Sequence, residues 1–249
     1  MGGVQRRAAA TTTRPGTGLA AGHSREGDDI GHVADLIARD FFDRPSDEVA
    51  PALLGCVLEH ETAEGLVAVE LTEVEAYAGE TDPASHAYRG ITGRNAVMFG
   101  PPGHAYVYFT YGMHFCVNVV CMPEGIARAV LLRAGRVIAG EPLARHRRAP
   151  RRTEAGPPAV IAARDLARGP ARLCQALAVD RTQNGADLCS VASELRLRPA
   201  GTSFRADGEP AIEAGPRVGI SAAADIPWRF WLAGDPTVSA YRPYKSRAR

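Results

Sequence analysis

The sequence predicts a single α+β domain built on a mainly antiparallel, curved β-sheet with surrounding helices and a protruding β-hairpin. Two observations carry this prediction. Segments rich in β-branched and apolar residues follow one another across short turns at 62–65 and 111–113, and such turns join antiparallel neighbours. Long helical patterns do not alternate with these segments, as a doubly wound parallel sheet requires. The hydrophobic content of 45% is enough for a sizeable core.

The N-terminal part of the sequence predicts a tail followed by two helices. Residues 1–29 are rich in Ala, Thr, Gly, Arg and Pro without hydrophobic periodicity, so a disordered tail is expected. The folded domain is expected to span residues 30–242, followed by a basic tail over 243–249. Ser46 is the expected N-cap of a short helix that ends at Leu54. An amphipathic helix before it is predicted by Val33, Leu36, Ile37 and Phe41.

The middle and the end of the chain predict strands, with a few interruptions. Gly, Pro, Asp and Ser make residues 79–104 loop-like, and residues 140–162 form a basic, partly helical surface segment. Its arginine run, Arg145–Arg152, is either a phosphate anchor or a flexible solvated loop. A helix with proline at its first position is expected from Gly169-Pro170 to Leu177. Strands are expected at 56–60, 66–75, 105–111, 114–121, 126–133, 186–198 and 215–233.

The basic residues of this chain are almost all arginine, because Lys245 is the one lysine among 29 Lys and Arg residues. A Walker-type phosphate loop needs a Gly-Lys pair, which the sequence lacks. Schiff-base catalysis needs a desolvated amine in a pocket, and a lysine beside a charged terminus is a poor candidate. The formal net charge of +1 says little about partners.

The five cysteines form no Cys-x-x-Cys motif and predict buried free thiols in a reducing compartment. His114, Cys116 and Asn118 share a strand face, where packed strand residues are favoured over a metal cluster. We therefore expect no metal and no cofactor. No stretch approaches 18 apolar residues, so no membrane span is expected. The expected location is the cytoplasm, with nucleoid association if the protein is bacterial.

The residues with the most evident chemistry lie between 73 and 133. Glu75 and Tyr77 end a strand two positions apart, so they project to the same side. A carboxylate at a strand end suits general-base chemistry, with a solvated surface glutamate as the alternative. Tyr111 lies at a hairpin tip and either contacts a neighbouring loop or enters a base stack as a wedge.

Asn118 and Arg133 are polar residues within apolar strands, which indicates either core hydrogen bonding or a site.

Together these motifs resemble the 3-methyladenine (alkylpurine) DNA glycosylase family of the alkyladenine glycosylase type. The resemblance runs from about residue 33 to residue 240, and several long motifs in the same order make it specific. It is carried by Glu73–Tyr77, His86, Gly93–Phe99, Tyr106–Asn118, Val130–Ala134, Gly169–Leu177 and Arg217–Ile220.

The resemblance implies an enzyme that flips a damaged purine out of duplex DNA and hydrolyses its N-glycosidic bond. Glu75 would activate the attacking water, which Arg133 would help to hold. The flipped base would stack on Tyr77 on one face. His86 and Tyr108 would contact its other face, and the backbone amide of His86 would contact the base edge.

Further roles follow from the same resemblance. Asn118 would disfavour the exocyclic amine of normal guanine, and Tyr111 would fill the hole left in the duplex. Met98, His114 and Arg94 would lie near the DNA. The family often has an aromatic residue where His114 stands, which leaves its groove contact open.

The expected partner is double-stranded DNA with damaged purines, and the expected state is a monomer. Because strand-cleaving glycosylases use an amine, the scarcity of lysine predicts a monofunctional enzyme that leaves an abasic site. The first alternative is a non-catalytic DNA damage-binding module of the same fold. The others are an RNA-directed N-ribosidase and an acyl-transfer hydrolase using Ser85, Cys121 or a histidine, which would lack a nucleophile elbow.

Overall fold

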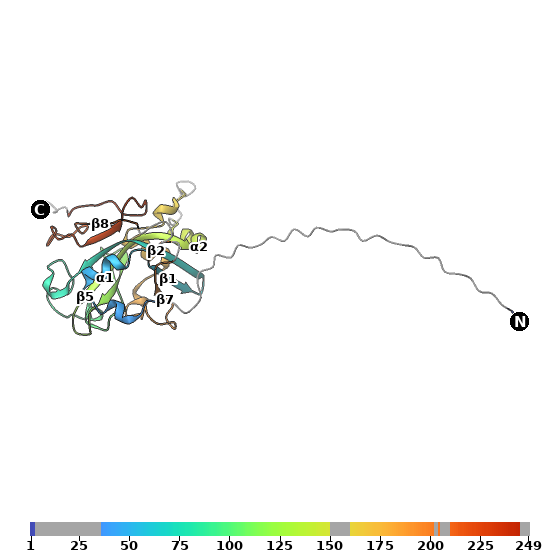
Figure 1. Cartoon of the computed structure of the whole chain (residues 1–249), viewed down its shortest axis with the longest axis horizontal. Coiled ribbons are helices and arrows are strands. Elements are labelled where there is room, and N and C mark those ends of the chain that lie inside the picture. The colour runs from blue at the N-terminus through green and yellow to red at the C-terminus, as the bar shows by residue number, and fades with distance from the viewer. Residues whose placement is uncertain (3–35, 150–159, 202–203, 205–209, 245–249) are drawn as a thin grey trace. The chain divides into compact units, whose positions relative to one another are not determined.

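The computed structural model describes residues 1–2, 36–149, 160–201, 204 and 210–244. The chain divides into residues 1–32 and residues 33–249, and every helix and strand described below lies in the second unit (Figure 1). Nearly all of the tail expected at 1–29 lies outside the described residues, as does most of the tail expected at 243–249. The predicted domain boundaries therefore stay predictions.

The described residues form one nine-stranded sheet accompanied by three α-helices. The predicted α+β class with antiparallel pairing is confirmed. The helices are α1 (Ser46–Ala52), α2 (Glu141–Arg148) and α3 (Pro170–Leu177). The strands are β1 (Val57–Thr62), β2 (Gly65–Tyr77), β3 (Ala105–Thr110), β4 (His114–Cys121), β5 (Arg128–Ala139), β6 (Ala167–Arg168), β7 (Leu195–Arg198), β8 (Ile212–Gly215) and β9 (Arg229–Leu232).

Strand β2 organises the sheet, whose main path runs β3-β4-β5-β2-β1-β7. The first half of β2 pairs with β1, and residues 73–75 pair with β9, so its neighbour changes along its length. Its pairing with β5 shifts register at three places, and such bulges bend and twist a sheet. Residues 67–76 of β2 are all buried although four of them are acidic or hydroxylic. Buried polar groups require partners, so this strand marks a site.

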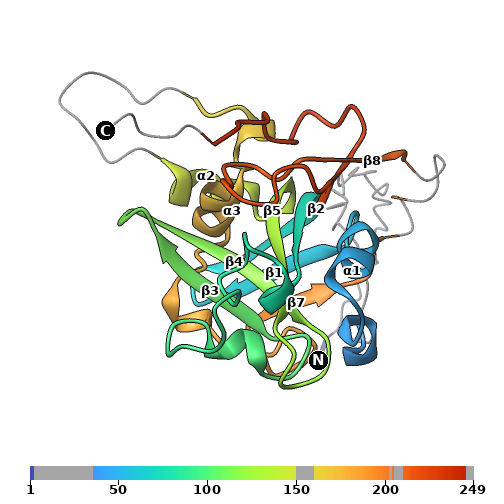
Figure 2. The ribbon, with the colours of Figure 1, turned by 90° about the vertical axis from the view of Figure 1, so that its left-hand side faces the viewer.

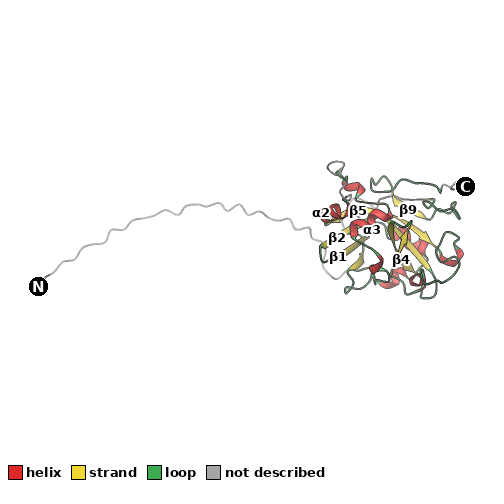
Figure 3. Cartoon of the chain, turned by 180° about the vertical axis from the view of Figure 1, so that it is seen from behind, coloured by secondary structure: helices red, strands yellow, loops and turns green. Residues whose placement is uncertain are grey.

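The helices pack against the central strands β2 and β5. In Figure 2, α1 lies to one side of these strands and α2 and α3 lie to the other. Figure 3 shows α2 and α3 next to each other. Residues of α1, α3 and the sheet share one apolar cluster that includes Val49, Leu71, Leu132 and Leu173. None of the described helices is long and apolar enough to cross a membrane.

Some predicted element ends were wrong. Pro45, not Ser46, is the N-cap of α1, because the Ser46 hydroxyl donates instead to the Tyr77 carbonyl at the end of β2 (3.0 Å). In place of the first helix there is a short 3-10 turn, Arg39–Phe42, in which adjacent aromatic residues turn into the core; residues 33–35 lie outside the described part. Of the strand expected at 186–198 only β7 forms. Of the strand expected at 215–233 only Gly215, which ends β8, and β9 form.

The hairpin of β3 and β4 is formed as predicted and reaches out from the sheet (Figure 2). Its turn places Tyr111 and Gly112 in the left-handed region, with φ of 51° and 68°. Glycine adopts that conformation without strain, whereas tyrosine rarely does. Tyr111 is 83% exposed, so the fold offers an aromatic ring to solvent at this tip.

Candidate active site

Strand register brings residues from five strands into one row. Glu75 on β2 is opposite Leu131 on β5, which is opposite Asn118 on β4, which is opposite Tyr106 on β3. On the other edge of β2, Arg229 of β9 is opposite Glu75. Directly opposed residues of an antiparallel sheet project to the same face, so side chains distant in sequence meet on one surface.

The same register places two aromatic rings on opposite sides of this row. Tyr77 lies two positions after Glu75 and is opposite Ala129. Tyr108 lies two positions after Tyr106 and is opposite Cys116. The row thus forms a floor with a tyrosine at each side.

A cavity of about 320 Å³ lies over this floor. Small-molecule sites typically measure about 300–1,000 Å³, so the cavity has room for one small planar ligand. It is lined by Glu75, Tyr77, Ala84, Ser85, His86, Met98, Tyr106, Tyr108, Thr110, Tyr111, Cys116, Asn118, Ala129, Leu131, Arg133, Pro170, Val218, Gly219 and Ile220.

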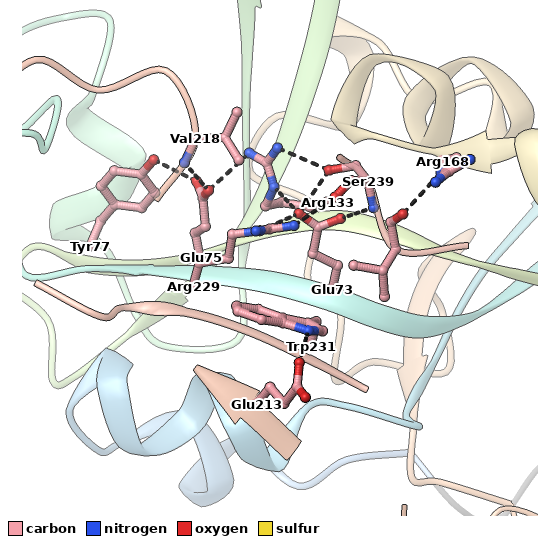
Figure 4. Close-up of polar contacts among 11 residues, drawn as sticks. Glu73, Glu75, Tyr77, Arg133, Arg168, Glu213, Val218, Arg229, Trp231 and Ser239 are labelled. Carbon is pink, nitrogen blue, oxygen red and sulfur yellow. Dashed lines mark hydrogen bonds and ion pairs between the residues drawn. The ribbon is translucent and has the colours of Figure 1, made fainter. Parts of the chain in front are cut away.

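Glu75 has no exposed surface and is held by three donors (Figure 4). Its Oε1 accepts the backbone N–H of Val218 at 2.7 Å and lies 3.1 Å from Nη1 of Arg133. Its Oε2 accepts the Tyr77 hydroxyl at 2.9 Å. These contacts fix the carboxylate in place, and a fixed, buried carboxylate facing a cavity is suited to accept a proton from a bound water.

Arg133 is buried and charged beside two carboxylates. Burial opposes its charge, but Glu75 and then Glu73 outweigh burial and raise the pKa of Arg133 above its ordinary value. Burial and then the charge of Glu75 raise the pKa of Tyr77 well above its ordinary value. The arginine therefore stays positive, and the tyrosine stays a hydroxyl that donates to Glu75.

The wall opposite Tyr77 consists of packed rings. His86 packs edge-on against Tyr108 with ring centres 4.5 Å apart, and its Nδ1 is 3.0 Å from the Tyr106 hydroxyl. His86 is itself exposed to solvent. Desolvation of its ring and then the charge of Arg94 lower its pKa, which favours the neutral imidazole. The amide of Asn118 is fixed because its Nδ2 donates to the Tyr106 carbonyl at 2.9 Å.

The other predicted site residues lie around the cavity. Tyr111 lines it from the hairpin tip, and Met98, which is 2% exposed, lies in its wall and not at the outer surface. The Arg94 guanidinium lies 5.7 Å from the centre of the Tyr108 ring and donates to the Phe109 carbonyl. His114 is exposed at the start of β4, outside the cavity lining. The DNA contacts expected of Met98, His114 and Arg94 stay predictions.

Four residues of this site were not predicted. Val218 contributes a backbone N–H, for which its side chain gives no signal. Glu73 accepts hydrogen bonds from Arg133, Arg229 and Ser239. The two-residue spacing of Glu73 and Glu75 on one buried strand was the available signal for Glu73, whereas Arg229 and Ser239 reach it from more than 150 residues away.

A buried ion pair lies against Tyr77, which lines the cavity. Arg217 donates to both carboxylate oxygens of Asp82 at 2.6 and 2.9 Å, and to the Ala76 carbonyl at 3.0 Å. Its guanidinium lies 4.7 Å from the centre of the Tyr77 ring. This pair connects the end of β2 to the loop that carries His86. In the described part of the chain, no three His, Cys, Asp or Glu residues lie together as a metal site would require.

Comparisons with known proteins identify the family of this chain. The family model described as methylpurine-DNA glycosylase matches residues 40–236. A relative from Streptomyces avermitilis is 51% identical, covering 86% of this chain and 95% of its own length. A relative from Frankia casuarinae is 53% identical (82% and 92%), and one from Burkholderia cenocepacia is 45% identical (84% and 93%). Each carries the provisional name 3-methyladenine DNA glycosylase. The chain belongs to the methylpurine-DNA glycosylase family and is a DNA glycosylase.

Proposed function

We propose that this enzyme flips an alkylated or deaminated purine out of duplex DNA into the cavity and hydrolyses its N-glycosidic bond, leaving an abasic site for base excision repair. The observation that carries the proposal is the buried Glu75 carboxylate. It is fixed by three donors at the floor of a cavity with aromatic walls. The relatives named for 3-methyladenine support an alkylated purine as one substrate.

The reaction requires a base and a stabilised cation. As the N-glycosidic bond breaks, its electron pair leaves with the purine and the sugar acquires oxocarbenium character. A water oxygen bonds to the anomeric carbon and gives its proton to Glu75. Arg133 and the Val218 N–H together orient both the Glu75 carboxylate and the attacking water. The carboxylate also stabilises the adjacent positive sugar.

Recognition of the base follows from the walls of the cavity. The flipped purine stacks on Tyr77, with His86 and Tyr108 against its other face, and the His86 backbone N–H contacts its edge. Asn118, held in place by its bond to the Tyr106 carbonyl, disfavours the exocyclic amine of guanine. Flipping costs a few kcal/mol and less for damaged or mispaired bases, so the duplex itself contributes to selectivity.

The enzyme is proposed to be monofunctional. No lysine is among the cavity-lining residues of the described chain, and the single lysine, Lys245, lies outside the described residues. Borohydride treatment during turnover is expected to trap no covalent protein–DNA adduct. A trapped adduct would contradict this part of the proposal.

Glu75→Gln tests the proposal. The variant keeps the size of the side chain but cannot take the proton, so release of hypoxanthine or 3-methyladenine from a duplex should fall by roughly 10²–10⁴-fold. Binding to the same duplex should be retained. Glu70→Gln is a matched control, because Glu70 lies on the same strand but outside the cavity. If wild type binds lesion DNA without releasing base, the chain is a binding module instead.

A further inference from the structure

Glu73, two positions before Glu75 on β2, is a second buried carboxylate, and two arginines bind it. Glu73 has no exposed surface. Its Oε1 accepts Nε of Arg133 at 2.7 Å, Nε of Arg229 at 2.8 Å and the Ser239 hydroxyl at 2.9 Å. Its Oε2 accepts the Ser239 N–H at 2.7 Å (Figure 4). All four donors point at one carboxylate that does not line the cavity.

This arrangement makes Arg133 a bridge between two carboxylates. Its Nε contacts Glu73 and its Nη1 contacts Glu75, so Glu73 holds one edge of the guanidinium while the other faces the cavity. Arg229, opposite Glu75 in the sheet, is held on Glu73 and on the Ser239 carbonyl. Burial opposes the charge of Glu73, but Arg133 and Arg229 outweigh it and lower the pKa of Glu73.

The buried charges therefore balance, with two carboxylates against two guanidinium groups. Buried charges are tolerated when each has a partner. If Glu73 were neutral, Arg133 and Arg229 would share Glu75 as their only nearby carboxylate in this cluster. The excess positive charge would lie close to the place where a sugar cation develops, which would slow bond cleavage.

We propose that Glu73 is a positioning residue for the glycosylase reaction: it compensates the charge of Arg229 and holds Arg133 so that Arg133 can serve Glu75. This inference rests on the proposed role of Glu75 as the base. Glu73 touches neither base nor sugar and acts through the arginines. Its removal should therefore affect the chemical step more than DNA binding.

Glu73→Gln separates the two effects. The single-turnover rate of base release from a hypoxanthine duplex should fall at least about tenfold, as for loss of a preorganised charge beside reacting atoms. The dissociation constant for the same duplex should stay equal or become lower. Glu213→Gln is the matched control, because Glu213 is an exposed carboxylate on β8 whose hydrogen bond within the described residues comes from the Trp231 indole (2.7 Å). It should keep the wild-type rate.

A second variant tests charge compensation directly. In Glu73→Gln/Arg229→Gln one carboxylate again faces one guanidinium, so base release should recover above the single variant. If thermal unfolding shows that the single variant does not fold, a folded double variant within about tenfold of the wild-type rate supports the proposal on the same electrostatic ground. A folded double variant as slow as Glu75→Gln overturns it.

The outcomes also separate this inference from the proposed function. If wild type releases no base, the proposed function fails. If wild type is active and Glu75→Gln is inactive, but Glu73→Gln releases base within twofold of wild type, only the inference about Glu73 fails. A Glu73→Gln rate that falls solely because lesion DNA is bound more weakly also overturns it.

Discussion

At the residue scale, Tyr111 combines features that folding alone does not favour. Its backbone is in the left-handed region, φ 51°, and its ring is 83% exposed. Tyr111→Gly should therefore leave the free energy of unfolding unchanged or raise it slightly, because glycine adopts this conformation without strain. Discrimination between lesion and undamaged duplexes should fall, because no ring would fill the gap left by a flipped base. Urea unfolding and competitive binding measure the two effects.

Tyr111→Phe is the control for this prediction. It keeps the ring and removes the hydroxyl, so it should discriminate between the duplexes as wild type does. If the glycine variant binds both duplexes with wild-type preference, Tyr111 is no wedge. If it unfolds much more readily than wild type, the ring packs against the protein.

The residue scale also shows which site residues sequence reasoning can reach. Alternation along a strand correctly placed Glu75 and Tyr77 on one side, and both line the cavity. Asn118 and Arg133 were conspicuous as polar residues in apolar strands. Val218 was not accessible to such reasoning, since it acts through its backbone. The partners of Glu73 depend on a strand and a C-terminal segment that come together only in the folded chain.

At the element scale, the 3-10 turn that follows β2 requires a glycine. Gly79 has φ of 62°, and a Cβ there would lie 1.7 Å from the Ala127 carbonyl oxygen. Gly79→Ala should lower the free energy of unfolding by about 2 kcal/mol or more, from backbone strain and this clash. It should also displace the loop that carries Asp82 and His86, so base release should slow. Urea unfolding and single-turnover rates check both effects.

Gly93→Ala is the matched control in the same region. Its φ lies outside the left-handed range, and a methyl group at this position would meet no atom within 4 Å beyond its own chain neighbours. It should unfold like wild type. Equal stability of the two alanine variants would contradict the strain argument.

The elements themselves were predictable where local pattern and tertiary environment agreed. The β3–β4 hairpin has turn residues at its tip, and α3 begins at Pro170 as its sequence indicates. Prediction failed where a distant partner decided the outcome. Ser46 has the right chemistry for a helix cap, but the Tyr77 carbonyl takes its hydroxyl. The strand expected over 215–233 is interrupted between Gly215, which ends β8, and β9, because residues 216–228 form no strand pairing.

At the scale of the whole folded unit, the site depends on segments far apart in the chain. β2 supplies Glu75 and Tyr77, the loop after it supplies His86, and a segment about 140 residues later supplies the Val218 N–H. Arg217 precedes Val218 and binds Asp82 in that loop as well as the Ala76 carbonyl. One side chain thus connects all three parts of the site.

Arg217→Met tests this connection. Arg217 and Asp82 have fully buried side chains, and removing one partner leaves an unpaired buried charge, which typically costs about 3–5 kcal/mol. Urea unfolding should show a loss of that order. Asp82→Asn/Arg217→Met should lose less, because no charge remains unpaired. Base release by the folded double variant should still be slow, since nothing then connects the Val218 segment to the His86 loop. A double variant with wild-type rates would show that the pair stabilises the fold without positioning the site.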